Sequence, residues 1–101
     1  MVIYEITAVV EQSLVEAYEN YICERHIPDL LKTGYFRGAR FTRSGGNRYR
    51  VHYEAFSQSA LDEYLKTEAE RLRADFLAYF PADIELSREV WEIVQIFNPD
   101  N

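Results

Sequence analysis

The segment from Ser13 to Arg43 constrains the fold most, because a helical pattern of apolar residues changes there into a strand pattern. Ser13, with Glu16 three residues later, fits a capping box, which predicts that a helix begins at Ser13. Apolar residues then recur at spacings of three and four as far as His26, so they share one helix face. Pro28 has no amide hydrogen and disfavours helical angles in the residue before it, so we expect the helix to stop or kink there.

Strand and helix patterns alternate along the rest of the chain. Pro28 can itself start a short second helical turn, and Gly34 predicts the end of that turn. Ser44–Asn47 predicts a further turn, because Gly and Asn tolerate positive φ. The second helix has an apolar stripe made of Leu61, Leu65, Leu72 and Phe76. The predicted elements are strands over Val2–Val10, Phe36–Arg43, Arg48–Phe56 and within Leu86–Phe97, and helices from Ser13 to His26 and from Ser57 or Ser59 to about Tyr79.

The resulting order, β-α-β-β-α-β, is typical of the ferredoxin-like fold of the α+β class. Right-handed crossovers place both helices on one face of a four-stranded antiparallel sheet. A length of 101 residues suffices for one hydrophobic core. We therefore predict a single ferredoxin-like domain over residues 1–97, followed by a frayed tail over residues 98–101.

The second face of this sheet has no helix to cover it, and it mixes apolar with charged side chains. Strand alternation assigns to this face Glu5, Thr7, Val9, Arg40, Thr42, Arg50, His52, Glu54, Phe56, Val90, Glu92, Val94 and Ile96. An exposed apolar patch of this extent usually marks an interface. We predict a homodimer in which two such sheets pack face to face and enclose a cavity.

Charge and cysteine content limit the partners. The chain carries 17 acidic residues against 11 Lys and Arg, for a net charge of −6, which argues against nucleic-acid binding. Cys23 is the only cysteine, which excludes an intrachain disulfide and fits a reducing compartment. The sequence contains neither a signal-peptide pattern nor an apolar run long enough for a membrane span. We expect a cytoplasmic protein with no membrane partner.

Two segments resemble a known family. Residues 24–43 (ERHIPDLLKTGYFRGARFTR) and 69–93 (AERLRADFLAYFPADIELSREVWEI) are similar to a family of small uncharacterised bacterial proteins, a domain of unknown function. The resemblance covers nearly the whole chain in matching order and implies the dimeric α/β-barrel superfamily. That superfamily includes cofactor-independent monooxygenases of antibiotic biosynthesis, muconolactone isomerases, polyketide cyclases, and dye or haem degraders. His26-Ile27-Pro28 is similar to a His followed by a Pro that several members carry beside the cavity mouth, at the end of the first helix.

His26 is the candidate catalytic residue, with two possible roles. Beside a polar cavity, an imidazole can act as a general acid or base, because its pKa lies near neutrality. At a helix C-terminus, a histidine can instead stabilise the helix through the dipole and the last carbonyl groups. The sequence leaves both roles open.

The charged residues of the open sheet face are candidates for substrate binding. Arg40 or Arg50 can hold an anion through two parallel hydrogen bonds. The alternative is that these charges pair across strands or across the dimer and keep the interface neutral. The candidate substrate-binding set is Glu5, Arg40, Arg50, His52, Glu54 and Glu92.

Two hypotheses for the function follow. The first is a cytoplasmic protein that binds or converts a small organic molecule in a cavity of the homodimer, without a bound cofactor. The second is a non-catalytic structural or regulatory module whose sheet face is only an assembly interface. Two histidines and one cysteine at unrelated spacings match no zinc pattern, so we predict no metal site, whereas haem ligation by a histidine stays open.

Overall fold

The computed structural model describes residues 1–100, and its elements follow the predicted order. The strands are β1 (Val2–Val10), β2 (Phe36–Ser44), β3 (Arg48–Ala55) and β4 (Ile84–Glu92). The helical elements are η1 (Gln12–Leu14), α1 (Val15–Tyr21), η2 (Ile22–His26), α2 (Ile27–Leu31), α3 (Gln58–Thr67) and α4 (Ala69–Tyr79). None of the helices within this part of the chain is long and apolar enough to cross a membrane.

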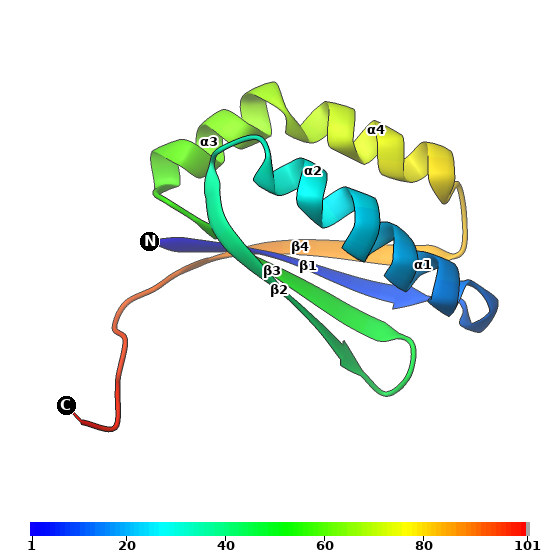
Figure 1. Ribbon diagram of the computed structural model, residues 1–101, viewed down its shortest axis with the longest axis horizontal. Coiled ribbons are helices and arrows are strands. Elements are labelled where there is room, and N and C mark those ends of the chain that lie inside the picture. Colours follow the sequence, from blue (N-terminus) through cyan, green and yellow to red (C-terminus); the bar gives the residue numbers. More distant parts are fainter. Residues whose placement is uncertain (101) are drawn as a thin grey trace.

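The four strands form one antiparallel sheet in the order β2-β3-β1-β4. All helices lie on the same face of this sheet, and the other face is uncovered (Figure 1). The prediction of a ferredoxin-like fold is therefore confirmed. β1 has the predicted bounds, and the β2–β3 hairpin turns at Gly45 and Gly46, whose φ angles are +68° and +93°.

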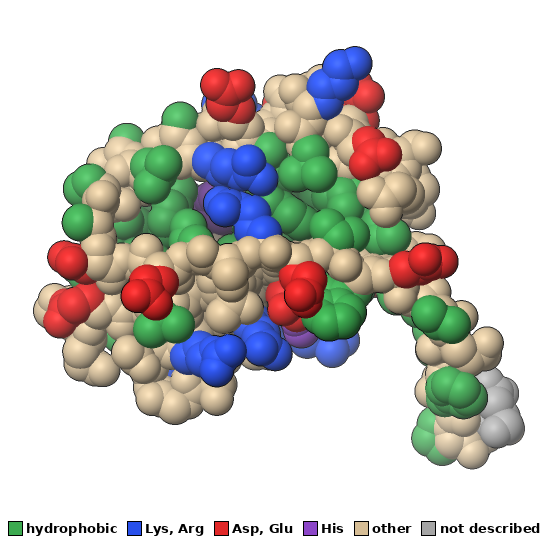
Figure 2. Space-filling view, turned by 180° about the vertical axis from the view of Figure 1, so that it is seen from behind, with side chains coloured by type: hydrophobic (Ala, Val, Ile, Leu, Met, Phe, Trp, Pro, Cys, Tyr) green, Lys and Arg blue, Asp and Glu red, His purple; other side chains and the backbone are tan. Residues whose placement is uncertain are grey.

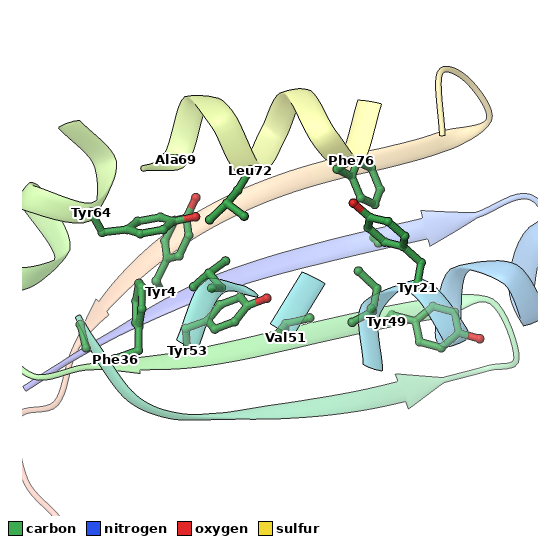
Figure 3. Close-up of a cluster of buried hydrophobic side chains, with 14 of the residues drawn as sticks. Tyr4, Tyr21, Phe36, Tyr49, Val51, Tyr53, Tyr64, Ala69, Leu72 and Phe76 are labelled. Atoms are coloured by element: carbon green, nitrogen blue, oxygen red, sulfur yellow. The ribbon is translucent and has the colours of Figure 1, made fainter. Parts of the chain in front are cut away.

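The core lies between the helices and the sheet, and aromatic side chains fill much of it (Figure 3). Alternate residues of β1 and β3 point into it, as the strand patterns predict. Tyr4 of β1 is paired with Tyr53 of β3, and both side chains are buried. From the helix layer, Tyr64 packs 6.0 Å from Tyr4 between ring centroids, and Phe76 lies 6.3 Å from Tyr18.

The first helix begins differently from the prediction. The side chain of Glu11, and not that of Ser13, caps the helical segment by accepting a hydrogen bond from the backbone N–H of Ser13 at 2.9 Å. The Ser13 hydroxyl donates to the same carboxylate. A 3₁₀ turn, η1, therefore precedes α1, and the prediction of Ser13 as the N-cap is wrong.

The helical segment also continues past Pro28. η2 is a π-helical turn in which the N–H of Ile27 donates to the carbonyl of Ile22, and Ile27 keeps helical angles of φ −61° and ψ −49°. Pro28 falls in the first turn of α2, where its missing N–H is not needed. His26 consequently lies inside a longer helical segment, so its predicted place at a helix C-terminus is wrong. The segment ends before Gly34, whose φ of +88° confirms that part of the prediction.

The second helix is broken into two. Ser57 accepts a hydrogen bond from the N–H of Ala60 and caps α3, but Glu68, at φ −122°, separates α3 from α4. The Thr67 hydroxyl donates to the carbonyl of Glu63, a contact that often bends helices. The prediction of one helix to Tyr79 is therefore wrong. Leu65, assigned to the buried stripe, is 37% exposed.

β4 presents the opposite faces from those predicted. It begins at Ile84, and its pairing with β1 places Val90 beside Tyr4 and Glu92 beside Val2, on the helix-covered side. Trp91, beside Ile3, takes the place on the open face. A shift of one residue exchanges the two faces of a strand, which is why the assignment of Val90 and Glu92 to the open face is wrong.

The chain beyond β4 leaves the sheet and runs away from it in an extended course (Figure 1). Val94, Ile96 and Phe97 are 89%, 61% and 84% exposed. The single domain over 1–97 stays a prediction. Of the predicted tail, residues 98–100 are described, and residue 101 lies outside the described residues.

Leu61 and Leu65 provide a direct test of this helix layer, because they lie on one helix with exposures of 0% and 37%. We expect Leu61→Ala to lower the free energy of unfolding by about 2–5 kcal/mol, since it leaves a cavity in the core. The matched change Leu65→Ala should cost less than about 1 kcal/mol. Urea denaturation measures both values, and equal losses would contradict the helix placement.

Candidate functional site

A cavity of about 220 Å³ lies between the helix layer and the sheet. Side chains from three strands and from both helical segments surround it. The lining residues are Tyr4, Ile6, Tyr18, Ile22, His26, Val51, Tyr53, Tyr64, Leu72, Arg73, Phe76, Leu77, Leu86 and Arg88. The sequence predicts a cavity between two sheets of a dimer, whereas this one lies inside a single chain, on the helix-covered side of the sheet.

Two residues that line this cavity each carry a buried polar atom with no hydrogen-bond partner within residues 1–100. The atoms are Nδ1 of His26 and the hydroxyl of Tyr53. Figure 3 shows the Tyr53 hydroxyl pointing along the sheet, away from Phe36. A buried polar group without a partner destabilises the fold, and most such groups in proteins are satisfied. Among the described residues, the two that carry such unsatisfied atoms, His26 and Tyr53, line the same cavity.

His26 is the last residue of the π-helical turn η2, and it lines the cavity. Its side chain is buried between aromatic rings, with centroid distances of 6.0 Å to Tyr21 and 5.8 Å to Phe76. Burial lowers the pKa of His26 to about 4, which Arg88 reinforces and the carboxylates of Asp29 and Asp75 oppose. The imidazole is therefore neutral near pH 7, with one nitrogen as donor and the other as acceptor.

Arg73 of α4 and Arg88 of β4 also line the cavity, from facing layers of the fold. A guanidinium nitrogen of Arg73 donates to the hydroxyl of Tyr4 at 3.1 Å. Neither arginine forms an ion pair with a carboxylate of residues 1–100. Both are exposed, and Figure 2 shows Lys and Arg side chains at an opening between helices and sheet, bordered by hydrophobic side chains. Neither arginine was among the residues predicted from the sequence; the correct faces of β4 would have identified Arg88.

The open face carries a second, wider depression of about 580 Å³. It brings together four of the predicted residues, which are Glu5, Arg40, His52 and Glu54. Nε2 of His52 lies 2.7 Å from Oε2 of Glu5 on the neighbouring strand. Trp91 adds an apolar wall that the sequence analysis assigned to the other face.

The other predicted residues do not join this depression. Arg50 shares the open face but lines a small pocket near the β2–β3 turn, and Glu92 lies on the opposite side of the sheet. The sequence suggests that Arg40 and Arg50 pair with acids, but within residues 1–100 neither arginine forms an ion pair. There, Glu5 pairs with His52, and Glu54 lies 3.8 Å from Nε of Arg37.

Neither site gathers a metal-binding set. Among residues 1–100, no group of three or more His, Cys, Asp or Glu side chains is arranged to hold a metal ion. The open-face residues include two acids and a histidine, but only Glu5 and His52 are in contact. The chemistry available in the internal cavity is therefore hydrogen bonding by tyrosine and neutral histidine, and charge from two arginines.

Comparison with known families finds one match. The model of a family described as "Domain of unknown function (DUF4286)" matches residues 1–94. Comparison with curated protein sequences finds no match.

Solved structures share this fold at low sequence identity. A putative antibiotic biosynthesis monooxygenase from Nitrosomonas europaea is 10% identical with a TM-score of 0.71, and the match covers 94% of this chain and 100% of that one. The heme-degrader MhuD from Mycobacterium tuberculosis, with two hemes bound in its active site, is 15% identical with a TM-score of 0.69, covering 97% and 100%. A dimeric ferredoxin-like protein from an uncultured marine organism is 7% identical with a TM-score of 0.73, covering 97% and 99%. At these identities the likeness establishes the fold alone.

The unpartnered Tyr53 hydroxyl leads to a stability prediction. Tyr53→Phe should leave the free energy of unfolding unchanged or raise it by up to about 1–3 kcal/mol, because it removes a buried group without a partner. Tyr49→Phe is the matched control, since the Tyr49 hydroxyl donates to Glu19 at 2.6 Å. That change should cost about 1 kcal/mol. Urea denaturation of both variants measures the difference, and a clear loss in Tyr53→Phe would refute the assignment.

The low pKa of His26 predicts how stability depends on pH. Below pH 6.5 the unfolded chain protonates this residue, whereas the folded chain does so only near its pKa of about 4. Stability should therefore be complete above about pH 6.5 and fall by roughly 3 kcal/mol toward pH 4. His26→Gln should remove this part of the loss. Urea denaturation between pH 7 and pH 4.5 tests it, and parallel pH profiles for the two proteins would show that His26 is not the source.

Proposed function

This chain belongs to the DUF4286 family, a domain of unknown function, and we propose that it binds a small organic molecule in the cavity between its helix layer and its sheet, without a bound cofactor. One observation carries the proposal. The two buried polar atoms without partners among residues 1–100 both belong to residues that line this cavity. A ligand that hydrogen-bonds to Tyr53 and His26 would remove the energetic penalty that each atom imposes on the empty protein.

The size of the cavity limits the ligand. A cavity of roughly 150 Å³ holds benzene, and sites for drug-sized molecules measure about 300–1,000 Å³. A volume of about 220 Å³ therefore suits one substituted ring or a short chain of similar bulk. It does not enclose the four pyrrole rings of a porphyrin. The residues of this cavity thus do not fit haem, although a protein of similar fold is described as a heme degrader.

His26 is the residue we assign to any chemistry in the cavity. Its neutral imidazole can accept a proton from a ligand held against Nδ1, and the aromatic rings around it exclude water. The names of the similar structures, which include a monooxygenase and a heme degrader, support a small-molecule site in this fold. The net charge of −6 and the single cysteine of the chain support a cytoplasmic protein without nucleic-acid or membrane partners, built as one domain over residues 1–97.

We also propose that the open sheet face forms a homodimer. Val9, Phe56 and Trp91 are 38%, 57% and 51% exposed, and one protein of similar fold is described as dimeric. The polar and charged residues of the open face then serve this interface and not the ligand. They are Glu5, Arg40, Arg50, His52 and Glu54. The alternative function, a non-catalytic module, would need this interface but not the cavity.

The two histidines allow a matched test of ligand binding, because they lie on opposite faces of the sheet. One- and two-ring aromatic compounds can be screened by ligand-detected NMR, and each hit measured by its effect on the melting temperature. A ligand present at about 100 times its Kd should stabilise the protein by about 2.7 kcal/mol. His26→Ala should abolish this stabilisation, whereas His52→Ala should retain it. Failure of every compound to bind, or equal loss in both variants, would count against the cavity.

The dimer is tested by molecular mass. Light scattering at micromolar concentration should give about twice the chain mass of 11.9 kDa, since a stable interface buries roughly 1,000 Å² or more. Trp91→Glu should yield a folded monomer, because it places a charge in the apolar part of the interface. Leu65→Glu, on the exposed side of α3, is the control and should remain dimeric. A monomeric parent protein would exclude the interface.

A further inference from the structure

We infer that the ligand of this cavity is an organic anion, a carboxylate held at the mouth by Arg73 and Arg88, with an apolar body inside and a polar substituent against Tyr53 and His26. This inference rests on the proposed function and adds the chemical class of the ligand. It is drawn from the charges around the cavity, the burial of its polar groups and its apolar walls.

The charged side chains that line the cavity all have one sign. The chain carries 17 acidic residues, yet none of the described acids lines this cavity, while two arginines do. Neither Arg73 nor Arg88 has a carboxylate partner within residues 1–100. Two unpaired guanidinium groups beside an apolar space favour an anion there, and the low dielectric of the walls strengthens that attraction.

The two arginines also have a suitable arrangement. Arg73 comes from α4 on one side of the cavity and Arg88 from β4 on the other, so they reach it from opposite layers of the fold. The hydrogen bond to the Tyr4 hydroxyl restrains Arg73, because Tyr4 itself is only 3% exposed. A guanidinium group presents a planar set of donors that matches the two oxygens of a carboxylate.

The remaining polar atoms lie deeper. Tyr53 is fully buried and His26 is 9% exposed, whereas both arginines are exposed. Between these two levels the walls are apolar, with Ile22, Leu72 and Leu86 among them. A molecule that satisfies every group therefore has a carboxylate at one end, a ring or short apolar chain in the middle, and a hydroxyl or carbonyl oxygen at the other end.

Three probes of nearly equal shape test the charge. They are 4-hydroxybenzoate, the neutral 4-hydroxybenzamide and the cationic 4-hydroxybenzylamine, with binding measured by titration calorimetry on the whole chain. We expect the carboxylate to bind about tenfold or more tightly than the amide, and the amine most weakly. Arg88→Gln and Arg73→Gln should each reduce the preference for the carboxylate to within about threefold and leave binding of the amide unchanged.

Arg71→Gln, on α4 with Arg73 but outside the lining of the cavity, is the matched control and should keep the full preference. Because the exposed arginines contribute little to the core, melting temperatures should confirm that every variant folds. If the carboxylate and the amide bind equally well, and His26→Ala abolishes the binding of both, the anion inference is overturned and the proposed function still stands. Binding of none of the three probes would overturn this inference, and the compound screen would then decide the proposed function separately.

Discussion

The packing of rigid aromatic side chains between the helices and one face of the sheet is the interaction on which the other features depend. Nine of the 19 buried apolar residues that form the core of the described chain are aromatic, and their planar rings cannot adjust their shape as Leu or Met side chains can. Tyr4, Phe36, Tyr53 and Tyr64 form one group, with centroid distances of 5.0 to 6.4 Å, and Tyr18 packs against Tyr49 at 5.0 Å in another. The cavity lies among these rings.

The use of tyrosine in such a core has an energetic cost. The Tyr49 hydroxyl is satisfied by Glu19, and that of Tyr4 by Arg73, but the Tyr53 hydroxyl has no partner within residues 1–100. A phenylalanine would fill the same space without the penalty. Natural proteins commonly retain such costs at binding sites, where a ligand supplies the missing hydrogen bond.

The sheet separates two polar regions with different characters. On the helix-covered face, Arg73, Arg88 and neutral His26 surround an apolar cavity. On the open face, acids and bases are mixed, and His52 already pairs with Glu5. A mixed and partly paired surface suits an interface between sheets, whereas unpaired charge of one sign suits a ligand. The one-residue shift of β4 decides this division, because it moves Arg88 to the cavity and Trp91 to the open face.

The sequence by itself determined the features that depend on neighbouring residues: the bounds of β1, the turn at Gly45 and Gly46, the stop at Gly34 and the ferredoxin-like order. It also singled out His26 and grouped Glu5, Arg40, His52 and Glu54. Only the tertiary structure decided the π-helical turn, the break at Glu68, the faces of β4 and the position of the cavity. The faces of β4 and the position of the cavity depend on contacts between distant segments. An edge strand such as β4 buries little on either face, so its apolar pattern does not reveal its orientation, and pairing with β1 sets it instead.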